Sequence, residues 1–551
     1  MASSLEPKHW EVFPRVERDL KNQLLLNRNL KDSNSKEKFI HPHLNLLTDP
    51  EKLFPDLGRA LARIKKAITE KELIYIYGDF DVDGITACAI LWESLDLLGA
   101  KILPYIPSRH SEGYGLNNEA LKFLSSEGAK LVITVDCGIT AIEQANYAKE
   151  LKLDLIITDH HQAQEVLPSS FATLHTTTLA GSGVAFKLAT ALLSEYGKDQ
   201  DEQFFKNLEL ATLGTVADMV PLLGENRVIV KNGLLNLAAS KRIGLKSLYE
   251  EAGLSNSIGT YEIGHVISPR LNAMGRMESA LDSLRLLLTR NPERGSKLAL
   301  KLGQTNRLRQ EATLSALEDA KKQVEKEYLG AKFFVVSSKN YEQGVVGLVA
   351  GRLTERFHRP SAVISEGLPV SKGSARSIKG FNITEAIHKH ADILLSHGGH
   401  PMAAGFSLDR AKIAPFREKM IKTAEELLTE EQLTPVLKID AQVEAEEIND
   451  QLFEAVRDLE PFGMGNPEPV FLLREVEVLE EKPVGKEKNH LRLTSRLPDG
   501  RIFPAIAFGF GEEPLKKGKK DIVFNLVKNT WGGRTNLEFR IKDLAEAGQA
   551  S

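Results

Sequence analysis

The chain has 551 residues, of which 42% are hydrophobic and 26% are charged, and its formal net charge at pH 7 is -4. This length predicts about three to four domains. The sequence has no apolar run of roughly 18 residues and no signal-peptide core, so we expect neither membrane spans nor secretion. Cys88 and Cys137 are too few for a disulfide framework and lack CxxC spacing, so we expect a reducing, cytoplasmic setting.

The N-terminal half predicts an α/β domain. Residues 1–50 are polar and are expected to form an arm that packs on the adjoining domain. Over 51–280, helical spacing alternates with short apolar runs, which predicts a parallel sheet. The expected strands cover 73–77, 101–107, 131–135 and 153–158, and the expected helices cover 56–70, 85–98, 140–150 and much of 184–240.

The C-terminal half predicts two further domains. Residues 290–329 have no proline after position 292, so a long connecting helix is expected within the segment 281–330. Residues 331–434 repeat the strand–helix–strand pattern and predict a second, smaller α/β domain. Residues 435–551 contain many short β-type runs separated by turns, which predicts a small antiparallel barrel or sandwich.

The most informative motif is YGDFDVDG at 77–84, where three aspartates alternate directly after a predicted strand. Those carboxylates of Asp79, Asp81 and Asp83 that converge could bind a metal. The pattern D-x-D-x-D-G also opens an EF-hand calcium loop, but position 12 of that loop should be Glu and is Ile90 here. A solvated acidic turn is the other alternative, and it gives no reason for acids at the carboxyl end of a strand.

Two more polar motifs come directly after predicted strands. Asp136 lies in VDCG, while Asp159, His160 and His161 lie in TDHHQ. Ligands of an open parallel sheet gather at the carboxyl ends of its strands, so we expect the three motifs at one edge. Oxygen ligands with one or two imidazoles suit Mn²⁺ or Mg²⁺, and this number of carboxylates suggests two ions. Two such ions can catalyse phosphoester hydrolysis by clamping the attacking and leaving oxygens.

Together, YGDFDVDG, VDCG and TDHH resemble the DHH phosphoesterase superfamily, and SHGGHPMAAGFS at 396–407 resembles the DHHA1 domain that accompanies it. The segments PSRHSEGYGLN, ATLGTVADMVPLLGENR, SPRLNAMGRM, GVVGLVAGRL and GSARSIKGFN resemble, in order and spacing, the RecJ family of 5′→3′ exonucleases specific for single-stranded DNA. The resemblance runs from about Phe39 into the C-terminal region. The architecture that it implies is a DHH domain over 51–280, a connecting helix over 281–330, a DHHA1 domain over 331–434 and an OB barrel over 435–551.

The resemblance also implies roles for individual residues. Asp218 in GTVADMVP could equally be an acid at a helix end, and only the resemblance makes it a metal ligand. His161 could bond to the scissile phosphate or support a bound hydroxide. The implied ligands of two Mn²⁺ or Mg²⁺ ions are Asp79, Asp81, Asp83, Asp136, His160 and Asp218. The implied catalytic residues are His161, Asp79 and Asp159.

Further polar residues are candidates for binding DNA phosphates. Arginine can hold a phosphate bidentately, and glycine lets backbone amides approach one closely. Arg376 could instead pair with a carboxylate, and Gly398 and Gly399 could simply form a turn. The candidates are Arg109, His110, Arg270, Asn272, Arg276, Ser374, Arg376, Ser377, Gly398, Gly399 and His400.

The C-terminal region combines basic and aromatic side chains, with which OB barrels bind single strands. Most aromatic residues of a small barrel belong to its core, so we expect only a minority of them to stack on bases. The basic residues are Lys482, Lys486, Lys488, His490, Arg492, Arg496 and Arg501, and the aromatic candidates are Phe503, Phe508, Phe510 and Trp531.

The predicted function is that of a metal-dependent exodeoxyribonuclease, which removes nucleotides from the 5′ end of single-stranded DNA in repair and recombination. One alternative is a DHH phosphodiesterase for short oligonucleotides or cyclic dinucleotides. Such relatives can lack an OB domain, so the barrel expected over 435–551 argues against this alternative. The other is an inactive DNA-binding scaffold, which should lack acidic ligands. The family implies a helicase and a single-strand-binding protein as partners, and we expect a monomer without membrane contact. One departure from the family is LHTTTLAG at 174–181, which replaces a segment that commonly bears proline.

Overall fold

The computed structural model describes residues 8–109, 111–198, 201–254, 258–328, 330–511, 515, 518–531 and 534–548. Contacts divide the chain into two units. The parallel-sheet unit consists of Asp32–Leu308 and Leu459–Pro467, and the barrel unit consists of Met1–Lys31, Arg309–Asp458 and Glu468–Ser551.

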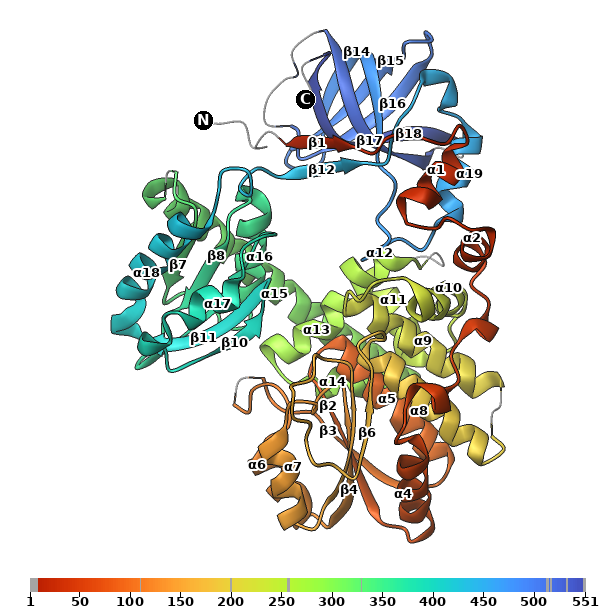
Figure 1. The fold of residues 1–551 in the computed structure, drawn as a ribbon, viewed down its shortest axis with the longest axis vertical. Coiled ribbons are helices and arrows are strands. Elements are labelled where there is room, and N and C mark those ends of the chain that lie inside the picture. The colour runs from red at the N-terminus through yellow and green to blue at the C-terminus, as the bar shows by residue number, and fades with distance from the viewer. Residues whose placement is uncertain are drawn as a thin grey trace. The chain divides into compact units, whose positions relative to one another are not determined.

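The parallel-sheet unit contains five strands that all run in the same direction (Figure 1). Strand β2 is buried along its whole length, as a strand covered on both faces should be. This sheet confirms the parallel α/β fold predicted for the N-terminal half. The spatial order is β3 (Lys101–Tyr105), β2 (Leu73–Gly78), β4 (Ala129–Val135), β5 (Asp154–Asp159) and β6 (Ala172–His175).

Helices cover both faces of this sheet. Successive residues of β2 alternate between two hydrophobic cores, because strand side chains point to opposite faces in turn. One core includes α4 (Leu57–Thr69), α5 (Val82–Leu97) and α8 (Gly181–Glu195), and the other includes α6 (Asn118–Ser126) and α7 (Ile142–Glu150). The unit also contains α2 (Ser33–Ile40), η1 (Leu44–Leu46), α3 (Pro50–Leu53), α9 (Asp201–Ala217), α10 (Gly224–Ala238), α11 (Ile243–Ala252), α12 (Thr260–Glu262), the π-helix η2 (Ile263–Ile267), α13 (Ser268–Met277) and α14 (Leu281–Leu288).

The predicted connecting helix is α15 (Pro292–Glu327), which is 36 residues long. It begins with proline, which suits the first turn because an N–H there would have no helical partner. Leu302 is buried in the core of the parallel-sheet unit, while Ala320 and Val324 are buried in a core of the barrel unit. The helix therefore contributes to the packing of both units.

The α/β part of the barrel unit is a mixed five-stranded sheet with helices. The two strands of this sheet that come first in the chain run parallel to each other, and all other neighbouring strands are antiparallel. The spatial order is β10 (Ser396–His400), β11 (Ala403–Asp409), β9 (Val370–Arg376), β8 (Ser361–Ser365) and β7 (Phe334–Ser338). The helices are α16 (Val346–Phe357), α17 (Ile383–His388), η3 (Ala391–Ile393), η4 (Arg410–Lys412) and α18 (Ile413–Leu427).

The C-terminal strands close into a ring, which confirms the predicted OB-like barrel (Figure 1). The ring closes because β14 pairs with both β15 and β17. Phe503 stacks on Phe539 in the interior with 4.3 Å between ring centroids, so it is a core residue and the stacking role considered for it is wrong. The ring runs β14 (Phe471–Val484), β15 (His490–Arg496), β16 (Ile502–Phe508), β18 (Arg534–Glu546) and β17 (Lys519–Trp531), preceded by β13 (Ala441–Gln442), η5 (Ala445–Glu447) and α19 (Asp450–Asp458).

The N-terminal residues pair with a distant part of the chain. Strand β1 (His9–Val12) runs parallel to β12 (Val436–Ile439), and Trp10 packs against Leu472 of the barrel. Helix α1 (Leu20–Asn27) comes next in the same unit. The sequence predicts that this arm packs on the adjoining domain, but residues 9–12 instead extend the barrel unit.

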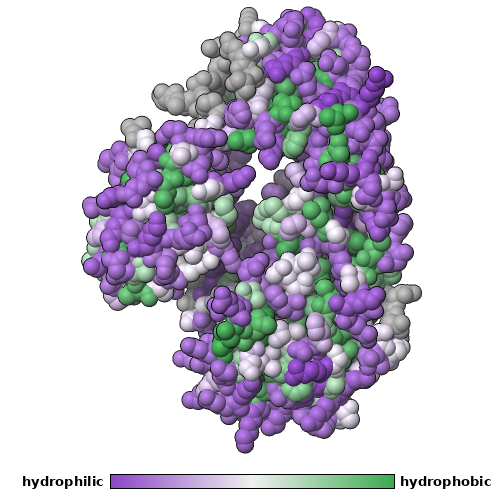
Figure 2. Space-filling view, viewed as in Figure 1, coloured by the Kyte–Doolittle hydropathy of each residue, from purple (hydrophilic) through white to green (hydrophobic). Residues whose placement is uncertain are grey.

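The surface visible in Figure 2 is mostly hydrophilic, with small and separate apolar patches. Isolated exposed apolar side chains are ordinary on globular proteins. None of the described helices combines the length and the apolar content that crossing a bilayer requires.

Candidate metal centre

The first group of aspartates lies where β2 ends and α5 begins. Asp81 is the N-cap of α5, and its Oδ1 accepts hydrogen bonds from the N–H groups of Asp83 (3.0 Å) and Gly84 (3.1 Å). A carboxylate here satisfies amides that have no partner within the helix. The N–H of Val82 donates to Oδ1 of Asn272 (3.1 Å). The aspartates are therefore held at a rigid strand-to-helix turn.

Asp83 is buried and points at the start of α8. Its two carboxylate oxygens accept hydrogen bonds from the N–H groups of Gly181 (2.6 Å) and Ser182 (2.9 Å). A helix N-terminus stabilises negative charge in this way. Position 181 requires glycine, because a Cβ there would lie 2.5 Å from Oδ1 of Asp136. The N-terminal amides of α8 therefore bind the carboxylate of Asp83, and glycine at position 181 leaves space for the side chain of Asp136.

Asp136 comes directly after β4 and has a left-handed backbone, with φ of 61°. This conformation is unfavourable for a residue with a Cβ and is concentrated at functional sites. The N–H of Asp136 donates to the carbonyl oxygen of Thr158 on β5 (3.0 Å). The buried carboxylate then lies beside His160, with 3.1 Å between Oδ1 and Nε2.

Asp159 uses both carboxylate oxygens within the loop after β5. Its Oδ2 accepts a hydrogen bond from the N–H of Ile139 (2.9 Å). Its Oδ1 accepts from the N–H groups of His160 (2.7 Å) and His161 (3.2 Å), and it lies 2.7 Å from Nδ1 of His161. Burial opposes charge on both groups, but their mutual hydrogen bond lowers the pKa of Asp159 and raises the pKa of His161. Asp159 is therefore suited to orienting the histidines.

His160 lies where three segments of the chain meet. Its Nε2 lies 3.1 Å from Oδ1 of Asp136 and 3.9 Å from Oδ2 of Asp83. It also lies 3.6 Å from Oδ2 of Asp218, which comes immediately after α9. Asp218 is thus an acid at a helix end and also a member of the cluster. Burial lowers the pKa of His160, which favours the neutral imidazole that can bind a metal.

The side chains form three overlapping groups, and within each group the ligand atoms lie within 4.8 Å of one another. Asp136 and His160 each belong to two of them, so neighbouring groups share ligands. This arrangement fits two adjacent ions. The groups are Asp79, Asp81 and Asp136; Asp83, His160 and Asp218; and Asp136, His160 and His161.

Three buried atoms of the cluster make no hydrogen bond within the described part of the chain, namely Oδ1 of Asp79, Oδ1 of Asp136 and Nε2 of His160. Leaving buried polar atoms unsatisfied is costly. Burial, together with the charge of neighbouring carboxylates, raises the pKa of Asp79 and Asp136 well above the ordinary value and raises the pKa of Asp218 to about 9. Divalent cations would relieve both problems, because they neutralise the carboxylates and take the free atoms as ligands. The residues therefore fit Mn²⁺ or Mg²⁺.

Several groups that support the centre were not predicted from the sequence. The amides of Gly181 and Ser182 hold Asp83, as described above. Nε2 of His175 lies 2.7 Å from the carbonyl oxygen of His161, and the hydroxyl of Tyr114 lies 3.2 Å from each ring nitrogen of His161. His175 belongs to the LHTTTLAG segment that departs from the family. No spacing pattern marks these residues, because they come from a loop, the end of β6 and the start of α8, and their contacts depend on tertiary packing.

Arg109 lies beside the first aspartate turn. Its guanidinium carbon is 5.1 Å from the centroid of the Phe80 ring. The carboxylates of Asp79 and Asp81 also act on Arg109 electrostatically. The neighbouring candidate, His110, lies outside the described residues. Arg109 thus keeps the position next to the cluster that its predicted role requires.

The candidates on α13 have partners within the protein. Arg270 pairs with Glu251 through Nε and Oε2 (2.8 Å), and its role in binding phosphate stays a prediction. Asn272 accepts the hydrogen bond from Val82 and so supports the aspartate turn. Arg276 lies partly buried in the last turn of the helix.

The candidates of the barrel unit lie on two strands and one loop. Ser374 and Arg376 share a face of β9, and Arg376 donates a hydrogen bond to Oγ of Ser374 (3.3 Å). Ser377 is buried and donates to the carbonyl oxygen of Phe381 (2.6 Å), which suggests a structural use. Strand β10, at the edge of the mixed sheet, contains the exposed residues Gly398, Gly399 and His400.

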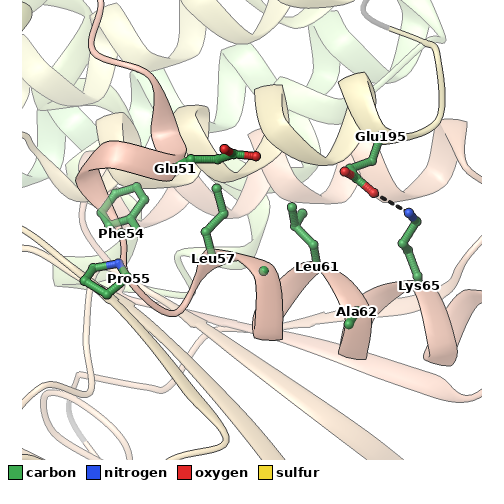
Figure 3. A pocket seen from close by; sticks show the side chains of 9 residues that line it. Glu51, Phe54, Pro55, Leu57, Leu61, Ala62, Lys65 and Glu195 are labelled. Atoms are coloured by element: carbon green, nitrogen blue, oxygen red, sulfur yellow. Dashed lines mark hydrogen bonds and ion pairs between the residues drawn. The ribbon is translucent and has the colours of Figure 1, made fainter.

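A separate hollow of about 360 Å³ lies on helices of the parallel-sheet unit (Figure 3). Its lining includes the apolar side chains of Leu57 and Leu61 on α4, and an ion pair joins Lys65 to Glu195 at one end. Ligand sites usually contain several converging polar groups. None of the predicted site residues lines this hollow, and we assign it no function.

Three domain families match consecutive parts of the chain. Residues 73–215 match the DHH family, N-terminal domain, and residues 330–430 match the DHHA1 domain. Residues 439–543 match the RecJ OB domain.

The whole chain is similar to proteins named single-stranded-DNA-specific exonuclease RecJ. The protein from Bacillus subtilis is 38% identical over 537 residues, which cover 95% of this chain and 67% of the relative. The protein from Haemophilus influenzae is 31% identical, over 90% of this chain and 92% of the relative. A crystal structure of RecJ from Thermus thermophilus in complex with Mn²⁺ has a TM-score of 0.84 and 30% identity, over 98% of this chain and 79% of that one. The structure with Mg²⁺ from the same source has a TM-score of 0.77 and 27% identity, over 98% and 78%.

Proposed function

The chain belongs to the RecJ family of single-stranded-DNA-specific exonucleases, and from this premise we propose that it hydrolyses single-stranded DNA from the 5′ end with two Mn²⁺ or Mg²⁺ ions. The enzyme class is that of a metal-dependent phosphodiester hydrolase. The processes in which it acts are DNA repair and recombination.

The observation that carries this proposal is the set of buried, unbonded ligand atoms at the strand ends. Bound ions would polarise the scissile phosphate and lower the pKa of a bound water. The first site would be formed by Asp79, Asp81 and Asp136, and the second by Asp83, His160 and Asp218, with Asp136 also available to the second.

His161 is proposed to contact the scissile phosphate. Asp159 fixes the ring of His161 and, against the effect of burial, raises its pKa. A protonated imidazole can donate a hydrogen bond to a phosphate oxygen, and a neutral one would more readily support a bound hydroxide. We propose the first of the two roles for His161, with its ring held in place by the contact between Nδ1 and Asp159.

The substrate strand is proposed to run over the outer face of β15 and β16. Phe508 is 56% exposed there and is paired across the strands with His490, with 5.1 Å between the ring centroids. Arg492 and Lys482 are also cross-strand neighbours, and neither has an ion-pair partner among the described residues. Exposed aromatic rings beside unpaired cations are typical of surfaces that bind single strands.

Each unit has its own candidates for phosphate recognition. Arg109 lies beside the aspartate turn, and Ser374 and Arg376 share a face of β9. Arginine and serine together offer several hydrogen-bond donors to one phosphate. We propose Arg109 for a phosphate at the metal centre and, separately, Ser374 and Arg376 for a phosphate of the bound strand.

We propose that the protein lies in the cytoplasm. Its proposed partners are a helicase, which separates the strands, and a single-strand-binding protein, which covers them. The family implies both partners, and a helicase also suits the specificity for single strands, because duplex DNA must be opened before the enzyme can act.

Digestion of end-labelled DNA tests the proposed polarity. With Mn²⁺, a single strand labelled at its 5′ end should release labelled mononucleotide from the first turnover, whereas a label at the 3′ end should appear last. The Asp136→Asn variant should lose this activity, because Asp136 lies in two ligand groups. Release from the 3′ end first, or no hydrolysis by the unmodified protein with Mn²⁺, would refute the proposal.

The alternative of a phosphodiesterase for short substrates predicts a different length dependence. A barrel that binds single-stranded DNA favours long substrates, so kcat/KM should be higher for a DNA strand of forty nucleotides than for a dinucleotide. Equal or higher kcat/KM for the dinucleotide would favour the alternative.

A further inference from the structure

The segment Leu459–Pro467 belongs by its contacts to the parallel-sheet unit, although the chain on either side of it belongs to the barrel unit. The chain thus leaves the barrel unit after Asp458, contacts the unit that holds the metal centre, and returns at Glu468. A segment of nine residues that crosses twice in this way is specifically retained by its partners.

Donors of the parallel-sheet unit bind a continuous run of carbonyl oxygens in this segment. The guanidinium of Arg227 donates to the carbonyl oxygens of Leu459 (3.0 Å), Glu460 (2.8 Å) and Pro461 (3.3 Å). The hydroxyl of Thr260 donates to the carbonyl oxygen of Phe462 (2.8 Å).

Arg227 is fully buried and is fixed on its other side as well. Its Nε donates to the carbonyl oxygen of Phe39 (2.6 Å), and its guanidinium carbon lies 3.7 Å from the centroid of the Phe39 ring. Within the segment, Asn466 is also buried and donates to the carbonyl oxygens of Leu459 and Pro461. The backbone of the segment is therefore held in one conformation.

The far end of the segment packs on the loop after Asp218. The N–H of Leu222 donates to the carbonyl oxygen of Met464 (2.7 Å). A Cβ added to Gly463 would lie 2.7 Å from Cδ1 of Leu222, and one added to Gly465 would lie 3.0 Å from Cβ of Pro221. The two glycines therefore allow the segment to pack directly against this loop.

On its other side, the loop is held by the last turn of α9, where the N–H groups of Asp218 and Met219 donate to the carbonyl oxygens of Gly214 (2.9 Å) and Val216 (3.4 Å). Met219 has a left-handed backbone, with φ of 60°, and its side chain is exposed. Asn226 donates a hydrogen bond to the carbonyl oxygen of Pro221 (3.0 Å). The backbone of Asp218 is thus fixed from α9, and the course of the chain beyond Met219 depends on how Pro221 and Leu222 are anchored.

We propose that Leu459–Pro467 is a positioning segment, which anchors Pro221 and Leu222 so that Asp218 stays at ligand distance from the ion shared with Asp83 and His160. This inference rests on the proposed metal-dependent function. It implies that the chain between α19 and the barrel has a role in metal binding that is separate from the binding of DNA by the barrel.

The Gly465→Ala variant tests this role. The new Cβ should push the segment away from Pro221, so the weaker of two Mn²⁺ binding steps, measured by calorimetric titration without DNA, should become about tenfold weaker. The tighter step should not change. The hydrolysis of a 5′-phosphorylated dinucleotide should need correspondingly more Mn²⁺ and should recover at high Mn²⁺.

The matched control is Gly253→Ala in the same unit. Gly253 also has a left-handed backbone, with φ of 65° against 74° for Gly465, but a Cβ added to it would meet nothing within 4 Å. Both variants carry the strain of a left-handed alanine, and only one contacts the loop. Gly253→Ala should titrate with Mn²⁺ as the unmodified protein does.

A second pair of variants covers the case in which Gly465→Ala does not fold. Thr260→Val removes the hydrogen bond to Phe462 at almost constant volume, and Thr260→Ser keeps it. The valine variant should weaken the same Mn²⁺ step, and the serine variant should restore it.

Unchanged Mn²⁺ binding in folded Gly465→Ala, an equal loss in Gly253→Ala, or equal behaviour of the two Thr260 variants would overturn the proposal. The titration contains no DNA, so a protein that binds two Mn²⁺ ions but does not cut DNA would refute the proposed function without affecting this test.

Discussion

At the scale of single residues, Asp159 differs from the other acids of the centre, because it belongs to none of the three ligand groups found among the described residues and hydrogen bonds engage both of its oxygens. Asp159→Asn should therefore keep two bound Mn²⁺ ions while kcat falls about 10- to 100-fold, since the orientation and charge of His161 are lost. Calorimetric counting of Mn²⁺ together with single-turnover rates checks this. Asp136→Asn is the comparison and should lose Mn²⁺ binding itself. Loss of an ion from the Asp159 variant would make Asp159 a ligand and contradict the assignment.

The carboxylates of the centre should exchange protons for metal. Burial and mutual repulsion raise the pKa of Asp79 and Asp136 and bring that of Asp218 to about 9, so the metal-free centre retains protons at pH 7. Mn²⁺ must displace them, so its affinity should rise with pH through the range near pH 9 in which Asp218 loses its proton. Titrations at pH 7, in buffers with different ionisation enthalpies, should show that Mn²⁺ binding releases protons. Binding without proton release would mean that the carboxylates are already ionised.

The ligand residues could be predicted from the sequence, whereas their supports could not. Asp79, Asp136 and His160 each come directly after an apolar strand, and parallel strands bring such positions to one edge. Gly181 and Asn272 reach the same place from segments that are about 100 and 190 residues away from the first aspartate turn. Their contacts depend on tertiary packing, which leaves no local pattern. Only the family resemblance could select Asp218, because its position after a helix is common for acids.

At the scale of elements, the start of α8 packs closely against two acids of the centre, Asp83 and Asp136. Gly181→Ala should abolish binding of at least one Mn²⁺ ion while the thermal unfolding temperature changes little, because the Cβ would lie 2.5 Å from Oδ1 of Asp136. Mn²⁺ titration and thermal unfolding of the same preparation measure the two effects.

The control for this variant is Gly58→Ala on the exposed face of α4, where a Cβ would meet nothing within 4 Å. Alanine is the better helix former, so this variant should bind Mn²⁺ normally and gain roughly 0.5–1 kcal/mol of stability. Normal Mn²⁺ binding by Gly181→Ala would show that α8 can move away and that the contact is not essential.

Most elements of the parallel-sheet unit follow from hydrophobic periodicity, but the edge strand β6 does not. Strand β2 is an apolar run covered on both faces, and α15 is long and polar without internal proline, so both are recognisable in the sequence. Strand β6 has only four residues, ATLH, with alternating burial, and its last two, Leu174 and His175, belong to the segment that departs from the family. A strand this short owes its conformation to pairing with β5, which the sequence alone does not reveal.

At the scale of the whole molecule, the barrel should determine affinity for the strand and the metal centre should determine the chemistry. Phe508→Ala should weaken binding of a forty-residue single strand by about 1–3 kcal/mol, the usual contribution of one stacked base. The kcat for a dinucleotide should not change, because Phe508 belongs to the barrel and not to the metal cluster. Fluorescence anisotropy and dinucleotide hydrolysis measure the two quantities.

Phe503 provides the control within the same strand. It is buried against Phe539, so Phe503→Ala should lower thermal stability first and affect DNA binding only through the fold. Equal DNA affinity of Phe508→Ala and the unmodified protein would remove this face of the barrel from the proposed path of the strand.

The long-range pairings of the chain were not predictable. Residues 9–12 pair with 436–439, and Leu459–Pro467 joins the parallel-sheet unit from within the other one. Local patterns identify strands and helices but not partners that are hundreds of residues away. The barrel was predicted because its many short strands and turns lie next to one another in the sequence.

The most direct test of the account is anomalous diffraction from crystals grown with Mn²⁺ and a non-cleavable, 5′-phosphorylated single strand. The account predicts two Mn²⁺ peaks, one bound by Asp79, Asp81 and Asp136 and the other by Asp83, His160 and Asp218, with the first phosphodiester from the 5′ end beside them. A single peak, peaks away from these residues, or a strand whose 3′ end lies at the metals would contradict it.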